Sequence, residues 1–207
     1  MNELVQLSKK HIQPASEVLS RAFQNDPVLR WQIPDANKRL VKIHNFWKLV
    51  LRIGIKYGEV YGTSENLEGI AIWRPPEKVN ISYWKFIKHG GYKFPFKFGV
   101  EVTKRMSFFQ AVNNSIRDIY MKVPYWYLDV IAVDPRHQGR GFARMLLDPM
   151  LKRIDKEQLP IWVETNLKRN VLFYERFDFN ILEEIIVPNT NIVNWFMIRR
   201  NGNQNFK

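Results

Sequence analysis

Residues 133–143 read Val-Asp-Pro-Arg-His-Gln-Gly-Arg-Gly-Phe-Ala and separate two runs of different character. Before them, residues 125–133 are β-branched and aromatic, which favours a strand, and Asp134-Pro135 cannot continue a helix or a central strand. After them, apolar residues recur every three or four positions, the period of a helix with one buried face. These residues are Phe142, Met145, Leu146, Met150 and Ile154. The sequence therefore predicts a strand, a glycine-containing loop and a helix.

The predicted junction between strand and helix is suited to an anion. The first amides of a helix have no intrahelical acceptor, and the helix dipole adds partial positive charge there. Gly139 and Gly141 carry no Cβ that would keep phosphate oxygens away from those amides. Arg136, Arg140 and Arg144 bring full positive charges. An ordinary turn with surface arginines would explain any one glycine alone, but the whole spacing favours a pyrophosphate site.

This spacing resembles the acetyl-CoA signature of the GNAT (GCN5-related N-acetyltransferase) superfamily, V-x-P-x-x-[RQ]-x-x-G-x-[GA]. Val133, Pro135, Gln138, Gly141 and Ala143 stand at its positions. A nucleotide P-loop would need a following Gly-Lys-Ser/Thr, and a dinucleotide fingerprint would need a third glycine; both are absent. The resemblance implies that the loop amides of residues 138–143 hold the pyrophosphate of acetyl-CoA.

Later residues resemble the same family. Residues 160–165 predict a strand, residues 170–177 a short helix, and Phe179 the start of a further strand. In the family this first strand splays from its neighbour to admit the pantetheine arm, and the helix carries residues that match Asn170 and Tyr174. The family usually has Gly-Phe after the helix, whereas this chain has Asp178-Phe179, so Asp178 must adopt the left-handed conformation of a helix C-cap.

The implied fold is α/β (α+β): a mixed, largely antiparallel twisted sheet of about seven strands. It has helices on both faces and a V-shaped opening between the fourth and fifth strands.

Residues 12–27 resemble the family's first helix and the turn near the acceptor, and residues 69–76 its third strand. We expect one acetyltransferase domain over residues 1–200, with a helical basic and aromatic insertion at 75–123 near the acceptor site. Residues 201–207 are expected to form a flexible tail. Pro149 is expected either to bend the main helix or to divide it in two.

The resemblance implies direct acetyl transfer to a primary amine in a ternary complex. A bulge in the fourth strand, matched to residues 130–133, would bind the pantetheine and the thioester carbonyl through free amides. Tyr174 would protonate the CoA thiolate, with a core tyrosine as the alternative, and Asn170 would order the arm or cap a helix. The implied acetyl-CoA-binding residues are Val130, Ile131, Ala132, Val133, Arg136, His137, Gln138, Gly139, Arg140, Gly141, Phe142, Ala143, Arg144, Asn170 and Tyr174.

The general base is left open among three possibilities. Asp129 precedes Val133 where family members often place a carboxylate or a histidine, and Glu164 on the neighbouring strand is second. A chain of water molecules is the third. An aspartate inside an apolar strand must be hydrogen-bonded or functional, because burying it unpaired is costly.

The formal charge of +12 comes mostly from the middle of the chain, where residues 74–124 carry 10 Lys and Arg against 3 Asp and Glu. Aromatic residues such as Trp84 and Phe86 interleave with these charges. We favour helices that cover the sheet, with aromatics inward and lysines outward, over nucleic-acid binding. As a wall of the acceptor pocket, this segment would disfavour a polycationic acceptor.

The amino-acid composition limits which cofactors, locations and partners can be expected. The chain has no cysteine, and its four histidines lie far apart, so we expect no metal cofactor. No N-terminal apolar segment reaches signal-peptide or membrane-span length, which predicts a cytoplasmic protein without a membrane partner. The expected partner is a small-molecule or peptide amine, and the expected assembly a monomer or homodimer. Alternatives are an inactive CoA-binding sensor or scaffold, and a nucleic-acid-binding module that uses residues 74–124.

Overall fold

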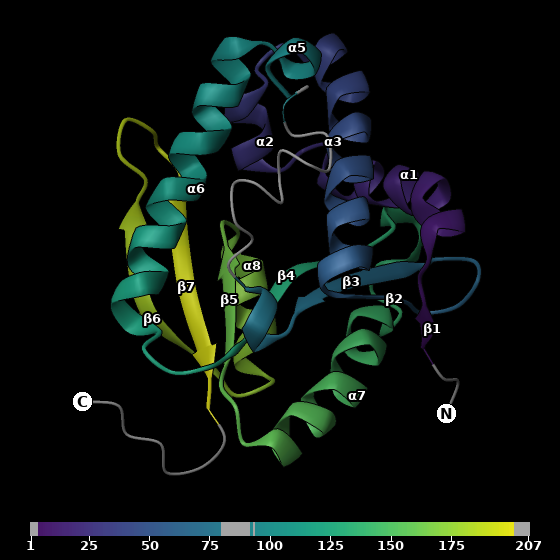
Figure 1. Cartoon of the computed structure of the whole chain (residues 1–207), viewed down its shortest axis with the longest axis vertical. Helices are drawn as coiled ribbons and strands as arrows, with labels where there is room; N and C mark the ends of the chain where they lie inside the picture. The colour runs from purple at the N-terminus through teal and green to yellow at the C-terminus, as the bar shows by residue number, and fades with distance from the viewer. Residues whose placement is uncertain (1–3, 80–91, 93, 201–207) are drawn as a thin grey trace.

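The computed structural model describes residues 4–79, 92 and 94–200, and a seven-stranded sheet runs through it (Figure 1). The spatial order is β1-β2-β3-β4-β5-β7-β6. The strands are β1 Val5–Gln6, β2 Glu59–Gly62, β3 Gly69–Arg74, β4 Trp126–Val133, β5 Ile161–Thr165, β6 Phe179–Ile186 and β7 Val193–Arg199. Neighbours pair antiparallel except β4 and β5, which are parallel. The predicted mixed, largely antiparallel sheet is therefore confirmed.

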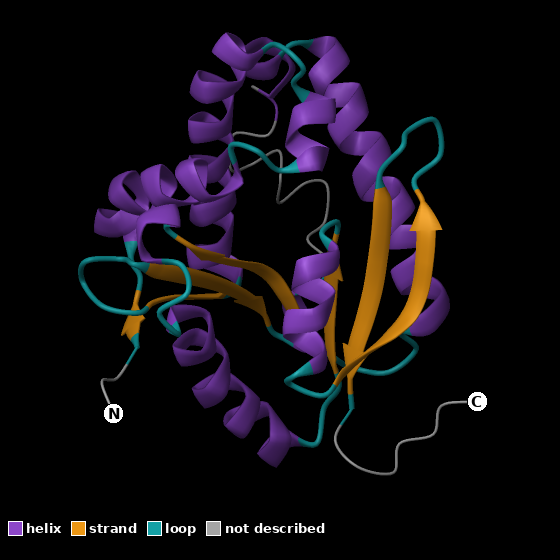
Figure 2. Ribbon diagram, turned by 180° about the vertical axis from the view of Figure 1, so that it is seen from behind, coloured by secondary structure: helices purple, strands orange, loops and turns teal. Residues whose placement is uncertain are grey.

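Helices cover both faces of this sheet (Figure 2). They are α1 Ile12–Phe23, α2 Pro27–Gln32, α3 Ala36–Tyr57, α5 Phe94–Phe98, α6 Val100–Tyr120, α7 Phe142–Glu157 and α8 Lys168–Glu175. One core cluster joins α1 and α3 to the sheet, and a second joins α7 and α8 to its other face. Asp26 and Asp35 begin α2 and α3, because each carboxylate accepts hydrogen bonds from two first-turn amides. In the described part of the chain, no helix is both long and apolar enough to cross a membrane.

The sheet opens between β4 and β5. Their pairing covers only Trp126–Leu128 against Ile161–Val163, and beyond it the two strands separate. Figure 1 shows β4 turning away toward β3 while β5 stays beside β7. This is the V-shaped opening that the family resemblance implies.

Strand β4 contains a bulge at the edge of this opening. Ile72 pairs with Val130 and Trp73 with Leu128, so Asp129 is an extra residue without a cross-strand partner. Leu128 packs in the core cluster of α7, whereas Val130 packs in the cluster of α1 and α3, although both positions have the same parity. The bulge therefore lies one residue before the predicted segment 130–133. Alternation in the sequence could not locate it, because a bulge reverses the faces of the strand.

Helix α7 is continuous through Pro149, which excludes the division into two helices. Its buried side chains, including Leu146, Met150 and Ile154, share one face against the sheet. After α8, Asp178 has a φ of 64°, the left-handed conformation predicted for it.

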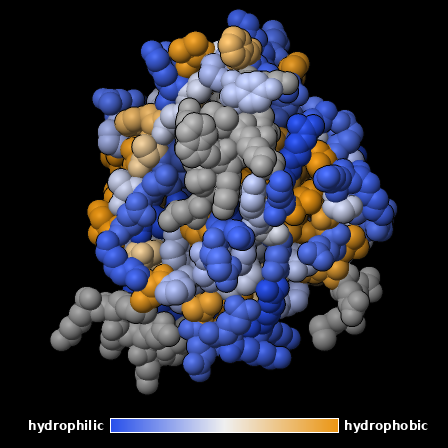
Figure 3. Space-filling view, viewed as in Figure 1, coloured by the Kyte–Doolittle hydropathy of each residue, from blue (hydrophilic) through white to orange (hydrophobic). Residues whose placement is uncertain are grey.

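The middle segment is helical where it is described, in α5 and α6. Phe98 and Phe109 point inward and are buried, whereas Phe96 is 90% exposed. In the space-filling view, hydrophilic residues cover most of the visible face, and apolar ones appear near its upper end (Figure 3). Trp84, Phe86 and the predicted tail 201–207 lie outside the described residues.

Candidate active site

The loop between β4 and α7 forms an open turn. A short 3-10 helix, Pro135–His137, follows β4 and begins at Asp134, whose carboxylate accepts from the Arg136 amide. Gly139 and Gly141 have φ values of 77° and 84°, where glycine alone avoids strain. Apart from the glycine itself and its two chain neighbours, no described atom lies within 4 Å of the position that a Cβ would take at either glycine. The turn therefore leaves room for a ligand beside its backbone.

Gly141 is the N-cap of α7, so the helix begins directly at this turn. The Met145 amide donates to the Gly141 carbonyl at 3.1 Å. The amides of Phe142, Ala143 and Arg144 precede this bond and have no intrahelical acceptor. These amides and the dipole of α7 suit a phosphate group, as the sequence predicts.

Asp134 anchors the start of the loop. Its side chain is 2% exposed and accepts hydrogen bonds from the Arg136 and Arg21 guanidiniums at 2.7–3.0 Å. The Arg136 guanidinium foremost, and then that of Arg21, hold the pKa of the Asp134 carboxyl far below its usual range. Arg136, which was predicted to bind phosphate, donates to Asp134 through Nε and Nη2, and its side chain is 66% exposed. This contact ties Arg136 to the start of the loop.

We expect the stability of the protein to depend on Asp134 mainly above pH 4. A carboxyl whose pKa is lowered in the folded state stabilises that state above its unfolded pKa, about 3.9, and the contribution is lost as the pH falls through the folded value. Asp134→Asn should therefore lower the urea midpoint at pH 7, with a deficit that shrinks below about pH 4. A deficit independent of pH would show that the ion pairs contribute nothing beyond the neutral hydrogen bonds.

Two predicted cationic residues remain available to a ligand. The Arg140 guanidinium lies 5.7 Å from the Phe142 ring centre, and that of Arg144 lies 4.9 Å from the Phe177 ring centre. Neither forms an ion pair with a carboxylate of the described residues. Both are exposed residues at the mouth of the turn. They are suited to neutralise phosphate charge.

Gln138 and His137 contact neighbouring parts of the same loop. Gln138 donates from Nε2 to the Val133 carbonyl at 3.2 Å and so holds the loop against the end of β4. The His137 ring lies 6.0 Å from the Phe142 ring, and its buried Nδ1 has no hydrogen-bond partner among the described groups. The sequence placed both residues at the anion site, and the structure keeps them in this turn.

Tyr174 and Asn170 lie on α8, which follows β5. Tyr174 is 5% exposed, and its ring packs against Phe173 and Phe179. Burial raises the pKa of the Tyr174 phenol well above its usual range, so the group stays protonated at neutral pH. Asn170 donates from Nδ2 to Thr165 Oγ1, the last residue of β5, at 3.0 Å. Asn170 thereby ties α8 to the edge of the opening.

Glu164 is enclosed by donors. Its side chain is 8% exposed and is paired with Arg117 at 3.2 Å. Asn113, Trp162 and Tyr127 donate to the same carboxylate at 2.6, 2.8 and 3.3 Å. Burial raises the pKa of the Glu164 carboxyl, and the Arg117 charge opposes this rise. Each oxygen of the Glu164 carboxylate thus accepts hydrogen bonds from two donors. This arrangement leaves Glu164 poorly placed to take a proton from a substrate.

Asp129 is paired as well. Both Nε and Nη2 of Arg74 donate to Asp129 Oδ2, at 2.8 and 2.5 Å. The structure therefore satisfies the expectation that an aspartate in this strand is hydrogen-bonded. It brings both candidate bases to the end of the β4 and β5 pairing, each in an ion pair.

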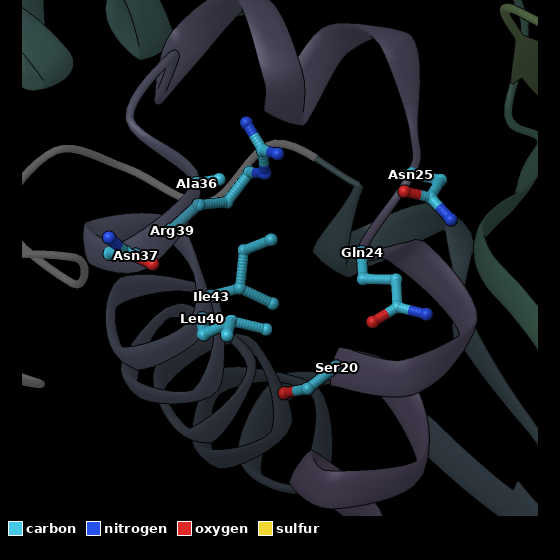
Figure 4. A pocket seen from close by; sticks show the side chains of 8 residues that line it. All are labelled: Ser20, Gln24, Asn25, Ala36, Asn37, Arg39, Leu40 and Ile43. Atoms are coloured by element: carbon cyan, nitrogen blue, oxygen red, sulfur yellow. The ribbon is translucent and has the colours of Figure 1, made fainter.

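A hollow of about 160 Å³ lies between the end of α1 and the start of α3 (Figure 4). It is lined by Ser20, Gln24, Asn25, Ala36, Asn37, Arg39, Leu40 and Ile43. Gln24 and Asn25 belong to the turn that the sequence places near the acceptor. None of the lining residues is among the predicted catalytic or acetyl-CoA-binding residues.

The sequence analysis did not identify the residues that pair with Asp134, Asp129 and Glu164. These are Arg21, Arg74, Asn113 and Arg117. For Asn113 and Arg117, the sequence did contain a signal. Together with Val102 and Phe109 they recur at helical spacing and form the buried face of α6. A polar residue on an apolar helix face must find a partner, and here both meet Glu164.

Known proteins share this sequence pattern and fold. Residues 106–179 match the model of the "Acetyltransferase (GNAT) family". An uncharacterized N-acetyltransferase of Schizosaccharomyces pombe is 26% identical over 188 residues, which cover 88% of this chain and 76% of the relative. The chain belongs to the GNAT superfamily. It is an acetyltransferase, and GNAT enzymes use acetyl-CoA as the acetyl donor.

Solved GNAT structures share the fold at low identity. A Corynebacterium glutamicum structure described as histone acetyltransferase HPA2 and related acetyltransferase has a TM-score of 0.71 and 20% identity, over 98% of each chain. Arylalkylamine N-acetyltransferase 2 of Aedes aegypti has a TM-score of 0.62 and 12% identity, over 96% of this chain and 98% of that one. At these identities the likeness shows the GNAT fold alone, so the acceptor has to be argued from this chain.

Proposed function

We propose that this GNAT protein moves an acetyl group from acetyl-CoA to a primary amine by direct transfer in a ternary complex. The observation that carries the proposal is the continuous path formed by the β4 bulge, the turn at Gly141 and the first turn of α7. It joins an opening in the sheet to a turn whose free amides suit an anion. A long molecule with a pyrophosphate near one end and a thioester at the other fits this path.

The proposed binding residues follow that path. Amides of residues 138–144 would hold the pyrophosphate, with Arg140 and Arg144 as charged partners. Backbone groups of residues 130–133 would bind the pantetheine arm in the opening, and Asn170 would border it. Arg136, which is paired with Asp134 at the start of the loop, would be a further charged partner of the pyrophosphate.

When bound, acetyl-CoA supplies a thioester whose carbonyl carbon is attacked by the amine, so that a C–N bond forms as the C–S bond breaks. Tyr174 donates its phenolic proton to the leaving sulfur and is reprotonated from solvent. Burial raises the pKa of the Tyr174 phenol, which keeps the group protonated at neutral pH. The amine loses its proton to a chain of water molecules, because Asp129 and Glu164 are both engaged in ion pairs.

For the acceptor we propose a small-molecule or peptide amine without several positive charges. Residues 74–124 have 10 basic against 3 acidic residues, and α6 lies over β5 and β7. A polycationic amine would meet a repulsive field there. We expect spermidine to be turned over more slowly than a monoamine, measured by CoA release. Equal turnover would remove the charge argument.

Gly141→Trp tests the proposed cofactor site. We expect it to weaken acetyl-CoA binding at least about tenfold, measured by titration calorimetry, because an indole would fill the open turn. Gly99→Trp is a matched control. Gly99 is also a helix N-cap with a positive φ, 90°, and a Cβ there would meet only the end of Lys42 at 3.9 Å. Its ψ of 152° lies outside the left-handed region that Gly141 occupies, so tryptophan at Gly99 strains the backbone at least as much as at Gly141.

The two variants separate binding from folding. If wild type and Gly99→Trp bind acetyl-CoA and Gly141→Trp does not, the cofactor lies in the turn. Equal binding by both variants would place the cofactor elsewhere. A folded wild type that does not bind acetyl-CoA would overturn the proposed function.

A further inference from the structure

We infer that Arg74 is a positioning residue that, through Asp129, holds the β4 bulge in the conformation that receives the pantetheine arm. The inference rests on the proposed acetyl-CoA site. It also gives Asp129 a role other than that of general base.

Asp129, the extra residue of the bulge, is held by no ladder pair. Asp129 has no partner on β3, and the β5 pairing of β4 ends at Leu128. An unpaired residue between two ladder pairs disrupts the ladder locally. Beyond the bulge, residues 130–133 pair with β3 again, so Asp129 is the point of β4 that no ladder pair holds and that side-chain contacts must fix.

Arg74 supplies such contacts from the end of β3. It stands opposite Tyr127, and its guanidinium lies 5.7 Å from the centre of that ring. The same guanidinium binds Asp129 Oδ2 through two nitrogens, at 2.8 and 2.5 Å. One side chain thus fixes two residues of β4, one before the bulge and one at it.

The ion pair between Arg74 and Asp129 is largely shielded from water, so it can hold the bulge. The side chains of Arg74 and Asp129 are only 21% and 14% exposed. Hydrogen bonds between ionised groups are stronger than those between neutral groups, and water competes little at this exposure. Proton transfer from an amine to Asp129 would disrupt this pair and leave a shielded guanidinium without its partner. The geometry therefore favours a positional role over proton abstraction.

Loss of the pair would affect the strand beyond the bulge. A shift of register by one residue turns every side chain to the opposite face. Val130 and Ala132 are buried against α1 and α3, which opposes a complete shift. We expect instead that residues 129–133 become mobile while the loop at Gly141, held by Asp134, stays in place.

Hydrogen exchange with mass spectrometry tests this, with acetyl-CoA at saturating concentration. The variants are Arg74→Met and Asp129→Asn. Arg153→Met is the control, since it removes the ion pair between α7 and Glu59 of β2, away from the opening. In wild type and control, acetyl-CoA should slow exchange in residues 129–133 and 138–144. In both test variants the second segment should stay protected and the first should not, with a Kd for acetyl-CoA raised about tenfold.

The result also decides between the possible roles. Protection of both segments as in wild type, with slow turnover by Asp129→Asn, would make Asp129 a base and overturn the inference. Loss of protection in both segments would mean that the pair only supports the fold, which also overturns it. If wild type shows no protection by acetyl-CoA, the proposed function itself fails. The Arg74→Met/Asp129→Asn double variant should bind no more weakly than either single variant, because both remove one interaction.

Discussion

Tyr174→Phe is expected to lower kcat about 10²- to 10⁴-fold while the Kd for acetyl-CoA stays unchanged. The substitution removes the proton that the leaving sulfur receives. It keeps the ring, whose centre lies 5.5 Å from those of both Phe173 and Phe179. No described residue is hydrogen-bonded to the Tyr174 hydroxyl, so its loss leaves no described group unpaired. The effect should therefore appear in the chemical step and not in binding or stability.

The measurement is CoA release with a primary amine identified by screening, together with calorimetry for acetyl-CoA. Tyr61→Phe is a suitable control, since that hydroxyl donates to Glu59 within β2. Because burial raises the pKa of Tyr174, wild-type kcat should show no decline from this group below about pH 10. A kcat close to wild type in Tyr174→Phe would mean that the sulfur takes its proton from another source.

The strand, loop and helix of residues 126–157 were predictable because each signal is local. β-branched residues, Asp134-Pro135 and a helical period specify elements through neighbours in the sequence. Gly139 and Gly141 were predicted to lie in a loop between strand and helix, and the structure places them there, both with positive φ. The opening between β4 and β5 followed from the family resemblance rather than from these local signals.

Contacts between distant segments could not be predicted in this way. Arg21 meets Asp134 across 113 positions, and nothing in the pattern of α1 distinguishes this arginine from a surface residue. The bulge at Asp129 was also hidden, because alternation shows a strand but not its register. Candidate bases were chosen by residue type and position, whereas their protonation depends on partners such as Arg74 and Arg117 that only the fold brings near.

Arg117→Met is expected to destabilise the protein by about 3–5 kcal/mol at pH 7, measured by urea denaturation. Arg117 and Glu164 have side chains that are 4% and 8% exposed, so removal of one leaves the other as a buried charge. Arg117 also lies 4.9 Å from the Tyr127 ring centre and joins α6 to β4 and β5. Arg153→Met is the comparison, because its pair with Glu59 is 45% and 20% exposed and is expected to contribute about 1 kcal/mol or less.

The pH dependence identifies Glu164 as the source of the loss. Burial raises the pKa of its carboxyl and Arg117 opposes the rise, so the variant should have a still higher folded-state pKa. A carboxyl whose folded pKa exceeds its unfolded value, about 4.3, costs stability as the pH rises above that value. The deficit of Arg117→Met should therefore be smaller at pH 4 than at pH 7. Arg117→Met/Glu164→Gln should recover part of it at pH 7, because no buried charge remains. A deficit that neither pH nor the second substitution changes would assign the loss to the packing of α6, and the ion pair would then have no part in holding the insertion on the sheet.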